Sequence, residues 1–500
     1  MSADQKPIVA KISGRVTLMG FTVRALKPLS RTDYLAIEKG GKTYVLGIQR
    51  IWRDKNALFA RLNIVGQVPN TPFESNEKIY IAEEEDIKQA LKIDVPEERS
   101  MNLGALIGTN IEATFTIDKL GRLFVTGRSG SGKSHTVGVI VEELIKKQIP
   151  IVIIDRHGEY SSLKVIKDDI DLPDCDFFNI EEPKHAFSQY IVEFGEENMN
   201  PGVDLGLDYL YASQPQDLVA KGQCTIINLR GLSLETQRET VDWLLNKLYK
   251  ASTKREISPF FLFIDEAHEL AGKRQTEVAD TVRLIAQEGR KFGMNLVVIT
   301  QRPQALNVTL RAQAGTWIIH KLTDVNDVKI TCKSAEGLSS KEDDELIQML
   351  DVGEAIIVGE ISPKSPVQVK IRQRYTVHGG AGYNILDYVK KDEDLHKSEM
   401  IKHLKNRIGK EDLERIKTAK GLGINPEELP KDYVKLKEKV EQLEMQKAQA
   451  DTEIEDLKEQ NSDLKAELKA WKIDFKQEKK RADDAVKVAE KLLKEIKKRK

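Results

Sequence analysis

The chain has 500 residues, more than one compact core normally holds, so we expect two or three domains. Hydrophobic residues make up 40% and charged residues 31%, and the net charge of -1 excludes a chain that is basic throughout. Three widely separated cysteines, an N-terminus without an apolar signal core and the lack of a bilayer-length apolar run favour a soluble, cytoplasmic protein without a membrane segment.

The first 95 residues contain short apolar runs broken by turn residues. Gly40 and Gly41 separate two strand-like runs and predict a hairpin turn. Several strands at this spacing indicate a small β-barrel or sandwich. The segment IAEEEDIKQAL at residues 81–91 is typical of a helix leaving that domain.

The middle of the chain alternates strands and helices. Predicted strands cover residues 123–126, 151–155, 225–229, 260–264, 295–300, 316–320 and 355–358; predicted helices cover 134–147, 234–250 and 276–292. Short, continuously apolar strands between helices predict an α/β fold with a mainly parallel sheet covered on both faces.

The last 70 residues are rich in charge and leucine. An unbroken heptad register places Tyr433, Val440 and every seventh residue after them at a, with Leu436, Leu443 and their repeats at d. This pattern predicts a C-terminal coiled coil through self-association or with a partner protein. A single solvated helix is the alternative.

The segment GRSGSGKS at residues 127–134 matches the phosphate-binding loop of P-loop proteins, and it stands between a predicted strand and a predicted helix. Backbone N–H groups of such a loop surround the phosphates, a lysine contacts the β and γ phosphates, and a serine hydroxyl binds Mg²⁺. The predicted ATP-binding residues are Gly127, Gly130, Ser131, Gly132, Lys133, Ser134 and His135.

An acidic pair follows the apolar run FFLFI. Asp265 and Glu266 stand at the carboxyl end of this predicted strand, where ligands of open parallel sheets bind. We expect Asp265 to hold Mg²⁺ together with Ser134, and Glu266 to polarise the attacking water.

A third segment, EGRKFGMNLVVITQRP, contains another predicted strand. Gln301 stands at the end of this strand, where a polar side chain can sense the γ phosphate. Arg290 closes the preceding helix, where a cation also suits the helix dipole; in a ring it would instead reach the nucleotide of a neighbouring subunit. The string Asp155-Arg156-His157-Gly158 is not that of a GTPase, because the chain lacks an N-K-x-D motif.

Together these segments, with IVIIDRHGEY, GQCTIINLRGLSLETQ and the late RYTVHGG, resemble the HerA helicase/translocase family of FtsK–HerA ring ATPases. The resemblance implies a RecA-like P-loop core, an N-terminal HAS-like barrel, a homo-hexameric ring and ATP-driven movement along double-stranded DNA. It also implies a NurA-like nuclease or another effector as partner.

The same resemblance carries over residue roles. It places Asp155 close to the catalytic centre, makes Gln301 a sensor, and makes Arg122 and Arg290 candidates for action across a subunit boundary. Arg156 departs from the proline that the family commonly has at this position. The long C-terminal heptad region is not explained by the resemblance.

The predicted domains are a barrel at 1–95, an ATPase domain at 96–390, a helical linker at 391–430 and a coiled coil at 431–500. Lys273 and Arg274, after the acidic strand, are candidate DNA contacts, and a solvated loop is an equal alternative. Two other functions stay open: a protein- or conjugation-type pumping ATPase, and an ATP-switched coiled-coil scaffold.

Overall fold

The chain divides into two compact units, Met1–Gly409 and Lys410–Lys500. Most of the predicted linker at 391–430 lies outside the residues that the structure describes. The computed structural model describes residues 6–498 except 171, 173–176, 178–185, 339–340, 363–364, 380–400, 403, 407, 409–412, 414–415, 418 and 420–432.

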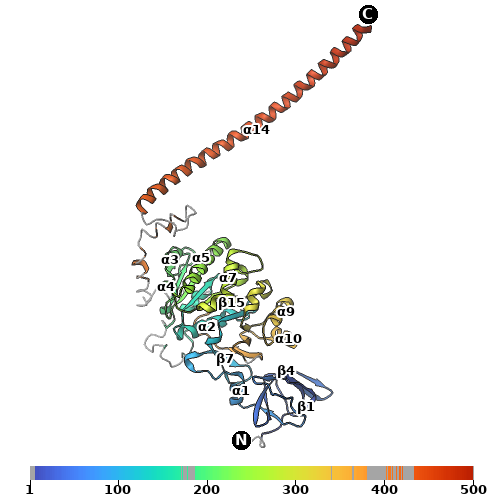
Figure 1. Ribbon diagram of the computed structural model, residues 1–500, viewed down its shortest axis with the longest axis vertical. Helices are drawn as coiled ribbons and strands as arrows, with labels where there is room; N and C mark the ends of the chain where they lie inside the picture. Colours follow the sequence, from blue (N-terminus) through green and yellow to red (C-terminus); the bar gives the residue numbers. More distant parts are fainter. Residues whose placement is uncertain are drawn as a thin grey trace. The chain divides into compact units, whose positions relative to one another are not determined.

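The first unit begins with a closed, antiparallel barrel of six strands, dark blue in Figure 1. The strands run around the barrel in the order β1-β2-β5-β4-β3-β6. Their bounds are β1 Ala10–Val16, β2 Gly20–Ala25, β3 Tyr34–Lys39, β4 Lys42–Asp54, β5 Ala57–Val65 and β6 Ile79–Ile81.

Alternation along these strands explains the barrel. Phe21, Val23 and Leu62 are fully buried in its interior, while the residues between them face outward. Gly40 and Gly41 both have positive φ in the tight β3–β4 hairpin, which confirms the predicted turn. Helix α1 (Glu84–Leu91) follows the barrel, as predicted, and buries Ile87 and Leu91.

The rest of the first unit is built on a sheet of twelve strands in the order β12-β11-β13-β10-β14-β15-β9-β16-β17-β18-β7-β8. The eight strands from β12 to β16 are parallel, and the remaining four are antiparallel. The parallel strands are β9 Arg122–Thr126, β10 Ile151–Asp155, β11 Ile191–Gly195, β12 Leu205–Gly206, β13 Cys224–Asn228, β14 Phe260–Ile264, β15 Met294–Thr300 and β16 Thr316–Ile319. The mainly parallel sheet is therefore confirmed.

The antiparallel end of this sheet is larger than the sequence predicted. It contains β17 (Glu354–Gly359), β18 (Val367–Ile371), β7 (Ser100–Leu106) and β8 (Glu112–Thr116), of which only β17 was predicted. Strand β7 precedes the phosphate loop in the chain but pairs with β18, which follows the rest of the sheet. This pairing is set by tertiary contacts between distant segments, so local patterns do not reveal it.

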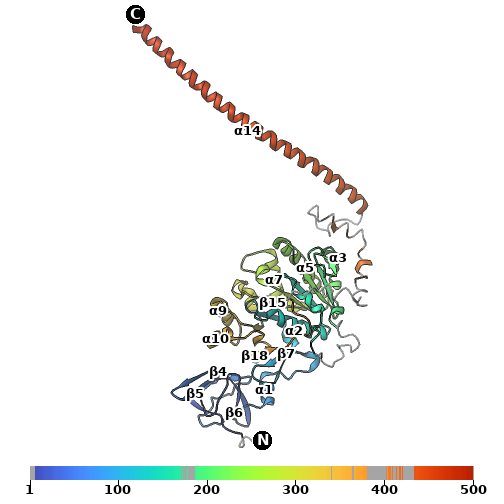
Figure 2. The same ribbon diagram turned by 180° about the vertical axis from the view of Figure 1, so that it is seen from behind.

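The three predicted helices of this part of the chain are present, and further helices that were not predicted accompany them. Helix α2 (Lys133–Lys146) packs against β7, β9 and β10, and α5 (Leu234–Thr253) packs against α7 (Glu277–Glu288). Helices α9 (Val325–Ser334) and α10 (Lys341–Met349) lie side by side in Figures 1 and 2. Shorter helices are α3 (Leu207–Ala212), α4 (Pro215–Leu218), α6 (Ala267–Leu270) and α8 (Val308–Gln313).

The second unit contains one long helix, α14 (Tyr433–Lys498). Several apolar side chains of its heptad positions, including Leu468, Trp471 and Phe475, are more than half exposed in the single chain. The helix itself agrees with the sequence, while the coiled coil stays a prediction. No helix among the described residues is both long and apolar enough to cross a lipid bilayer.

Candidate active site

The phosphate loop connects β9 to α2 at the carboxyl edge of the parallel strands. Gly132, at the N-terminus of α2, has a φ of 109°, a backbone conformation that side-chain-bearing residues rarely adopt. A Cβ on Gly127 would lie 2.6 Å from both His320 Cβ and Ser131 Oγ. The glycines therefore allow a tight turn that other residues would obstruct.

Side chains within the loop stabilise its shape. Ser131 is 1% exposed, and its hydroxyl donates to the Arg128 carbonyl at 2.7 Å. Lys133 Nζ donates to the same carbonyl at 3.1 Å. Burial lowers the pKa of Lys133, against the opposing charges of Glu266 and Asp265. The lysine is thus held over the loop and close to the acidic pair.

Ser134 and His135 occupy the first turn of α2, and both are half-buried. The His135 ring lies 2.8 Å from the Arg372 carbonyl through Nε2. Its side chain is therefore engaged by the segment after β18, and its backbone N–H is the group left to contact a phosphate.

His320, for which the sequence predicted no role, connects the segments that lie beside the phosphate loop. His320 is fully buried after β16; its Nδ1 lies 2.8 Å from the Glu354 carbonyl and its Nε2 lies 2.9 Å from Thr136 Oγ1. Burial lowers its pKa to about 4, so the ring is neutral at pH 7. It joins β16, β17 and α2 beneath the phosphate loop.

The acidic pair lies at the carboxyl end of β14. Asp265 is 4% exposed, and burial together with the charges of Asp155, Glu266 and Glu159 raises its pKa well above the ordinary value. Glu266 adopts a left-handed backbone conformation with a φ of 43°, which is unusual for a residue with a side chain. Glu266 is the residue immediately before α6, so this backbone conformation connects β14 to that helix.

His268 contacts the second carboxylate of the pair. Its Nδ1 lies 3.1 Å from Glu266 Oε2 and 3.1 Å from Thr300 Oγ1 at the end of β15. Burial raises the pKa of Glu266, but the hydrogen bond and charge of His268 and the charge of Lys133 outweigh this effect and lower it. Gln301, the next residue after Thr300, is half-buried at the same edge.

Asp155, predicted to lie close to the catalytic centre, ends β10, and its charge is one of those that raise the pKa of Asp265. The Asp155 carboxylate is fully buried and accepts four backbone hydrogen bonds, of which the shortest come from Gly158 N at 2.8 Å and Tyr160 N at 2.9 Å. Burial nevertheless raises its pKa to about 7. The side chain therefore holds the DRHGEY turn in shape.

Glu159, in the same turn, is a second carboxylate whose charge acts on the residues of the candidate site. Its charge influences the pKa of both Lys133 and Asp265, and its side chain is half-buried rather than enclosed. The sequence predicted no role for Glu159, although the DRHGEY segment is part of the family resemblance. Its position four residues after Asp155, at the end of a predicted strand, was the sequence signal that could have indicated a site residue.

Arg122 and Arg290 lie away from these groups. Arg122 begins β9, whereas the phosphate loop follows the end of the same strand. Arg290 precedes β15, and a Cβ on Gly121 would lie 2.8 Å from Arg290 Nε. Arg122 contacts Gln313, and Arg290 Nη1 lies 3.3 Å from Glu360 Oε2. The two arginines thus share the edge of the sheet opposite their own phosphate loop.

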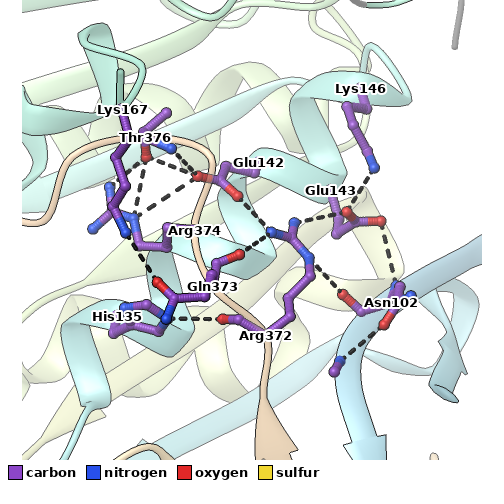
Figure 3. Close-up of polar contacts among 11 residues, drawn as sticks. Asn102, His135, Glu142, Glu143, Lys146, Lys167, Arg372, Gln373, Arg374 and Thr376 are labelled. Atoms are coloured by element: carbon purple, nitrogen blue, oxygen red, sulfur yellow. Dashed lines mark hydrogen bonds and ion pairs between the residues drawn. The ribbon is translucent and has the colours of Figure 1, made fainter. Parts of the chain in front are cut away.

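A polar cluster fixes α2 against the antiparallel strands, as Figure 3 shows. Arg372 Nη1 and Nη2 lie 2.9 Å from Glu142 and 2.8 Å from Glu143, and Arg372 Nε donates to the Asn102 carbonyl at 3.2 Å. Thr376 N and Oγ1 both donate to the same Glu142 carboxylate. Segments far apart in the chain therefore immobilise the helix that begins at the phosphate loop.

The donor set suits Mg²⁺ and a nucleoside triphosphate. Mg²⁺ prefers oxygen ligands and usually binds one or two carboxylates together with substrate phosphates. The Ser134 hydroxyl and the Asp265 carboxylate are oxygen donors at the same edge of the sheet. A divalent cation there would relieve the crowding of negative charge that raises the pKa of Asp265.

A parallel sheet with a phosphate loop after one strand and an acidic pair after another defines the P-loop ATPases. The model of the helicase HerA central domain matches residues 101–292. The DNA double-strand break repair helicase HerA of Sulfurisphaera tokodaii is 26% identical over 59% of this chain and 74% of its own. The probable HerA of Methanocaldococcus jannaschii is 25% identical over 76% of this chain and 98% of its own. The chain is therefore similar to the HerA family, with the family model covering its central part, and it is an ATPase.

Among solved structures, the genome packaging NTPase B204 from Sulfolobus turreted icosahedral virus 2 is similar over 51% of this chain and all of that chain. Its sequence identity is 17% and its TM-score is 0.34.

Proposed function

We propose that this protein is an ATP-driven translocase on double-stranded DNA that acts as a homo-hexameric ring in the cytoplasm. The observation that carries the proposal is the HerA family relationship, because relatives along most of the chain are named as DNA double-strand break repair helicases. A NurA-like nuclease or another effector would act with the ring in DNA end processing.

The proposed chemistry uses the groups at the carboxyl edge of the sheet. Backbone N–H groups of the loop and the Lys133 ammonium bind the phosphates, and Ser134 and Asp265 hold Mg²⁺. The cation, when bound, neutralises charge on the phosphate oxygens. Glu266 orients the attacking water, and its ionised form is favoured by His268 at 3.1 Å. Gln301 senses the γ phosphate from the end of β15.

The positions of two arginines support the proposed ring. Arg122 and Arg290 lie at the opposite edge of the sheet from their own phosphate loop, so neither reaches the nucleotide bound there. In a ring, that edge would face the phosphate loop of the adjacent subunit. Arginines in this position stabilise charge that develops on the transferred phosphoryl group.

Lysines near the carboxyl edge supply a candidate DNA contact. Lys273, Lys329 and Lys333 line one cleft of about 290 Å³ together with Gln304, Asn326 and Ile330. Lys273 and its neighbour Arg274 are both exposed. Repeated around a ring, such cations would bind backbone phosphates without reading bases.

The helix α14 favours a second candidate, an ATP-switched scaffold that works through a coiled coil. Hydrolysis measured with and without long duplex DNA separates the two. The translocase predicts strong stimulation by duplex, whereas the scaffold predicts none at low salt. Lys133→Ala and Glu266→Gln should each abolish turnover, and normal hydrolysis in either variant would disprove the assignment of the site.

A further inference from the structure

The barrel is positively charged, although the net charge of the whole chain is close to zero. Residues 6–65 contain twelve Lys or Arg residues against three Asp or Glu, although the whole chain has a net charge of -1. Proteins that bind nucleic acid concentrate positive charge on one face in this way.

Strand register gathers part of this charge on one outer face. Across β1, β2, β5 and β4, Lys11 pairs with Arg24, Arg24 with Phe59, and Phe59 with Trp52. In a neighbouring row, Arg61 pairs with Arg50. The alternate residues on these strands, such as Val23, Ala60 and Leu62, fill the barrel core. The six residues therefore point outward together, and we call them the barrel platform.

Two rings lie at the centre of the barrel platform. Trp52 and Phe59 are stacked, with ring centroids 6.0 Å apart and planes 17° apart. Both are half-buried, while Lys11, Arg24 and Arg50 around them are exposed. Asp54 at the tip of the β4–β5 hairpin is the acidic residue on this side. Within the described residues, neither Lys11 nor Arg24 forms an ion pair, so their charge is available to a ligand.

The barrel platform continues toward the ATPase core. Asn63, two residues beyond Arg61 on the same face of β5, donates to Ser365 Oγ at 2.9 Å. Arg61 and Asn63 also line a groove of about 240 Å³ that includes Gln368 of β18. A ligand on the barrel platform would therefore lie beside the motor core rather than on a remote surface.

We propose that the barrel platform binds single-stranded nucleic acid, such as the unpaired end of a DNA that the ring engages. Aromatic rings stack on base faces, which are accessible only where bases are unpaired, and cations beside them hold the phosphates. A duplex would present its backbone to the cations but leave the rings without a partner. The proposal rests on the proposed translocase function and adds a second DNA contact, on the barrel.

The test uses the full chain and a fluorescent 20-nucleotide oligothymidine, with binding followed by anisotropy. We expect Trp52→Ala with Phe59→Ala to weaken binding about 10-fold or more, since stacking contributes about 1–3 kcal/mol per base. Arg24→Ser with Arg61→Ser should make the plot of log affinity against log salt shallower by about 1.4. The charge-matched control is Lys27→Ser with Lys42→Ser, which removes two exposed cations away from the barrel platform and should change little.

Trp52→Tyr keeps a ring at the centre of the barrel platform and should retain binding, which separates loss of stacking from misfolding. Unchanged oligonucleotide affinity in the Trp52→Ala, Phe59→Ala variant would overturn the proposal. Disassembly of the ring with unchanged oligonucleotide affinity would instead identify a subunit interface. Duplex-stimulated hydrolysis, measured in parallel, should persist in every variant. Its absence in the wild-type chain would count against the translocase, and absent oligonucleotide binding alone would count against the barrel platform.

Discussion

His268 Nδ1 lies 3.1 Å from Glu266 Oε2. The histidine side chain therefore orients the carboxylate of Glu266. The His268 side chain is 7% exposed and also lies 3.1 Å from Thr300 Oγ1, which links the ends of β14 and β15. A carboxylate that directs a water needs such an orienting partner, because small displacements of a catalytic group lower its rate strongly.

We therefore predict that His268→Ala lowers kcat for ATP about 10- to 100-fold, the range typical of lost orienting partners. The KM for ATP should change little, because His268 does not contact the phosphate loop in any described interaction. Steady-state kinetics measure both constants. Glu269→Gln is the control, since Glu269 lies 3.5 Å from the other ring nitrogen and is partly exposed. Equal kinetic losses in both variants would contradict a specific role for the His268–Glu266 contact.

The second prediction concerns the arginines at the opposite edge of the sheet. Arg290→Ala should retain ATP binding but lose hydrolysis about 1000-fold, as loss of an arginine finger does. Its ion pair with Glu360 is partly exposed, so the fold should be little affected. Lys291→Ala, which removes an exposed cation at the next position, is the matched control.

Mixed rings then show in which subunit the arginine acts. Subunits with Lys133→Ala are expected to be inactive but still carry Arg290, and subunits with Arg290→Ala keep an intact phosphate loop. If Arg290 acts on a neighbour, an equimolar mixture regains hydrolysis that neither variant shows alone. A mixture that stays inactive, although native mass spectrometry shows mixed rings, would place the arginine in its own subunit's site.

The third prediction is a pH dependence of stability. His320 has its pKa lowered by burial to about 4, below its ordinary value of 6.5. As pH falls below 6.5, the unfolded chain binds a proton that the folded chain does not, so folding becomes less favourable until about pH 4. At pH 5 this proton binding lowers the free energy of unfolding by about 2 kcal/mol.

Thermal unfolding between pH 7.5 and 4.5 measures this effect. His320→Gln should unfold at a lower temperature at pH 7.5, because the contacts with Glu354 and Thr136 change. Its midpoint should nevertheless fall less steeply with acid than that of the wild-type chain. Parallel curves for the two proteins would show that His320 does not carry the dependence.

The sequence predicted the elements that bear local signals. The strands that end at Thr126, Asp155 and Ile264 are continuous apolar runs that are buried on both faces, and the phosphate loop has a fixed glycine spacing. These features place the loop and the acidic pair at one edge without reference to distant residues. The predicted strands and helices of the core are confirmed for this reason.

Other contacts depend on which distant segments become neighbours. Arg372, which follows β18, meets Glu142 because β18 pairs with β7 and β7 packs against α2, a relationship that no local pattern contains. His320 reaches Thr136 only because β16 lies next to β9 in the sheet. The burial of Asp155 by four backbone N–H groups likewise depends on the conformation of the turn that follows it.

The last prediction concerns the heptad region of α14. Leu468 and Phe475 at a and Trp471 at d are more than half exposed in the single chain, and their apolar area is what a partner helix would bury. An unsupported helix opens rapidly in water, whereas a coiled coil protects its backbone amides. Hydrogen-exchange mass spectrometry of the full chain should therefore show slow exchange in peptides that span residues 460–480.

Leu468→Glu with Phe475→Glu should abolish this protection, because two apolar contacts of about 1.5–3 kcal/mol each would be replaced by charge. Ile473→Glu is the matched control: Ile473 is 54% exposed, similar to its neighbours, but occupies an f position that faces away from the partner. Protection lost equally in the control would contradict the heptad register. Rapid exchange in the wild-type chain would show that α14 is a solvated single helix.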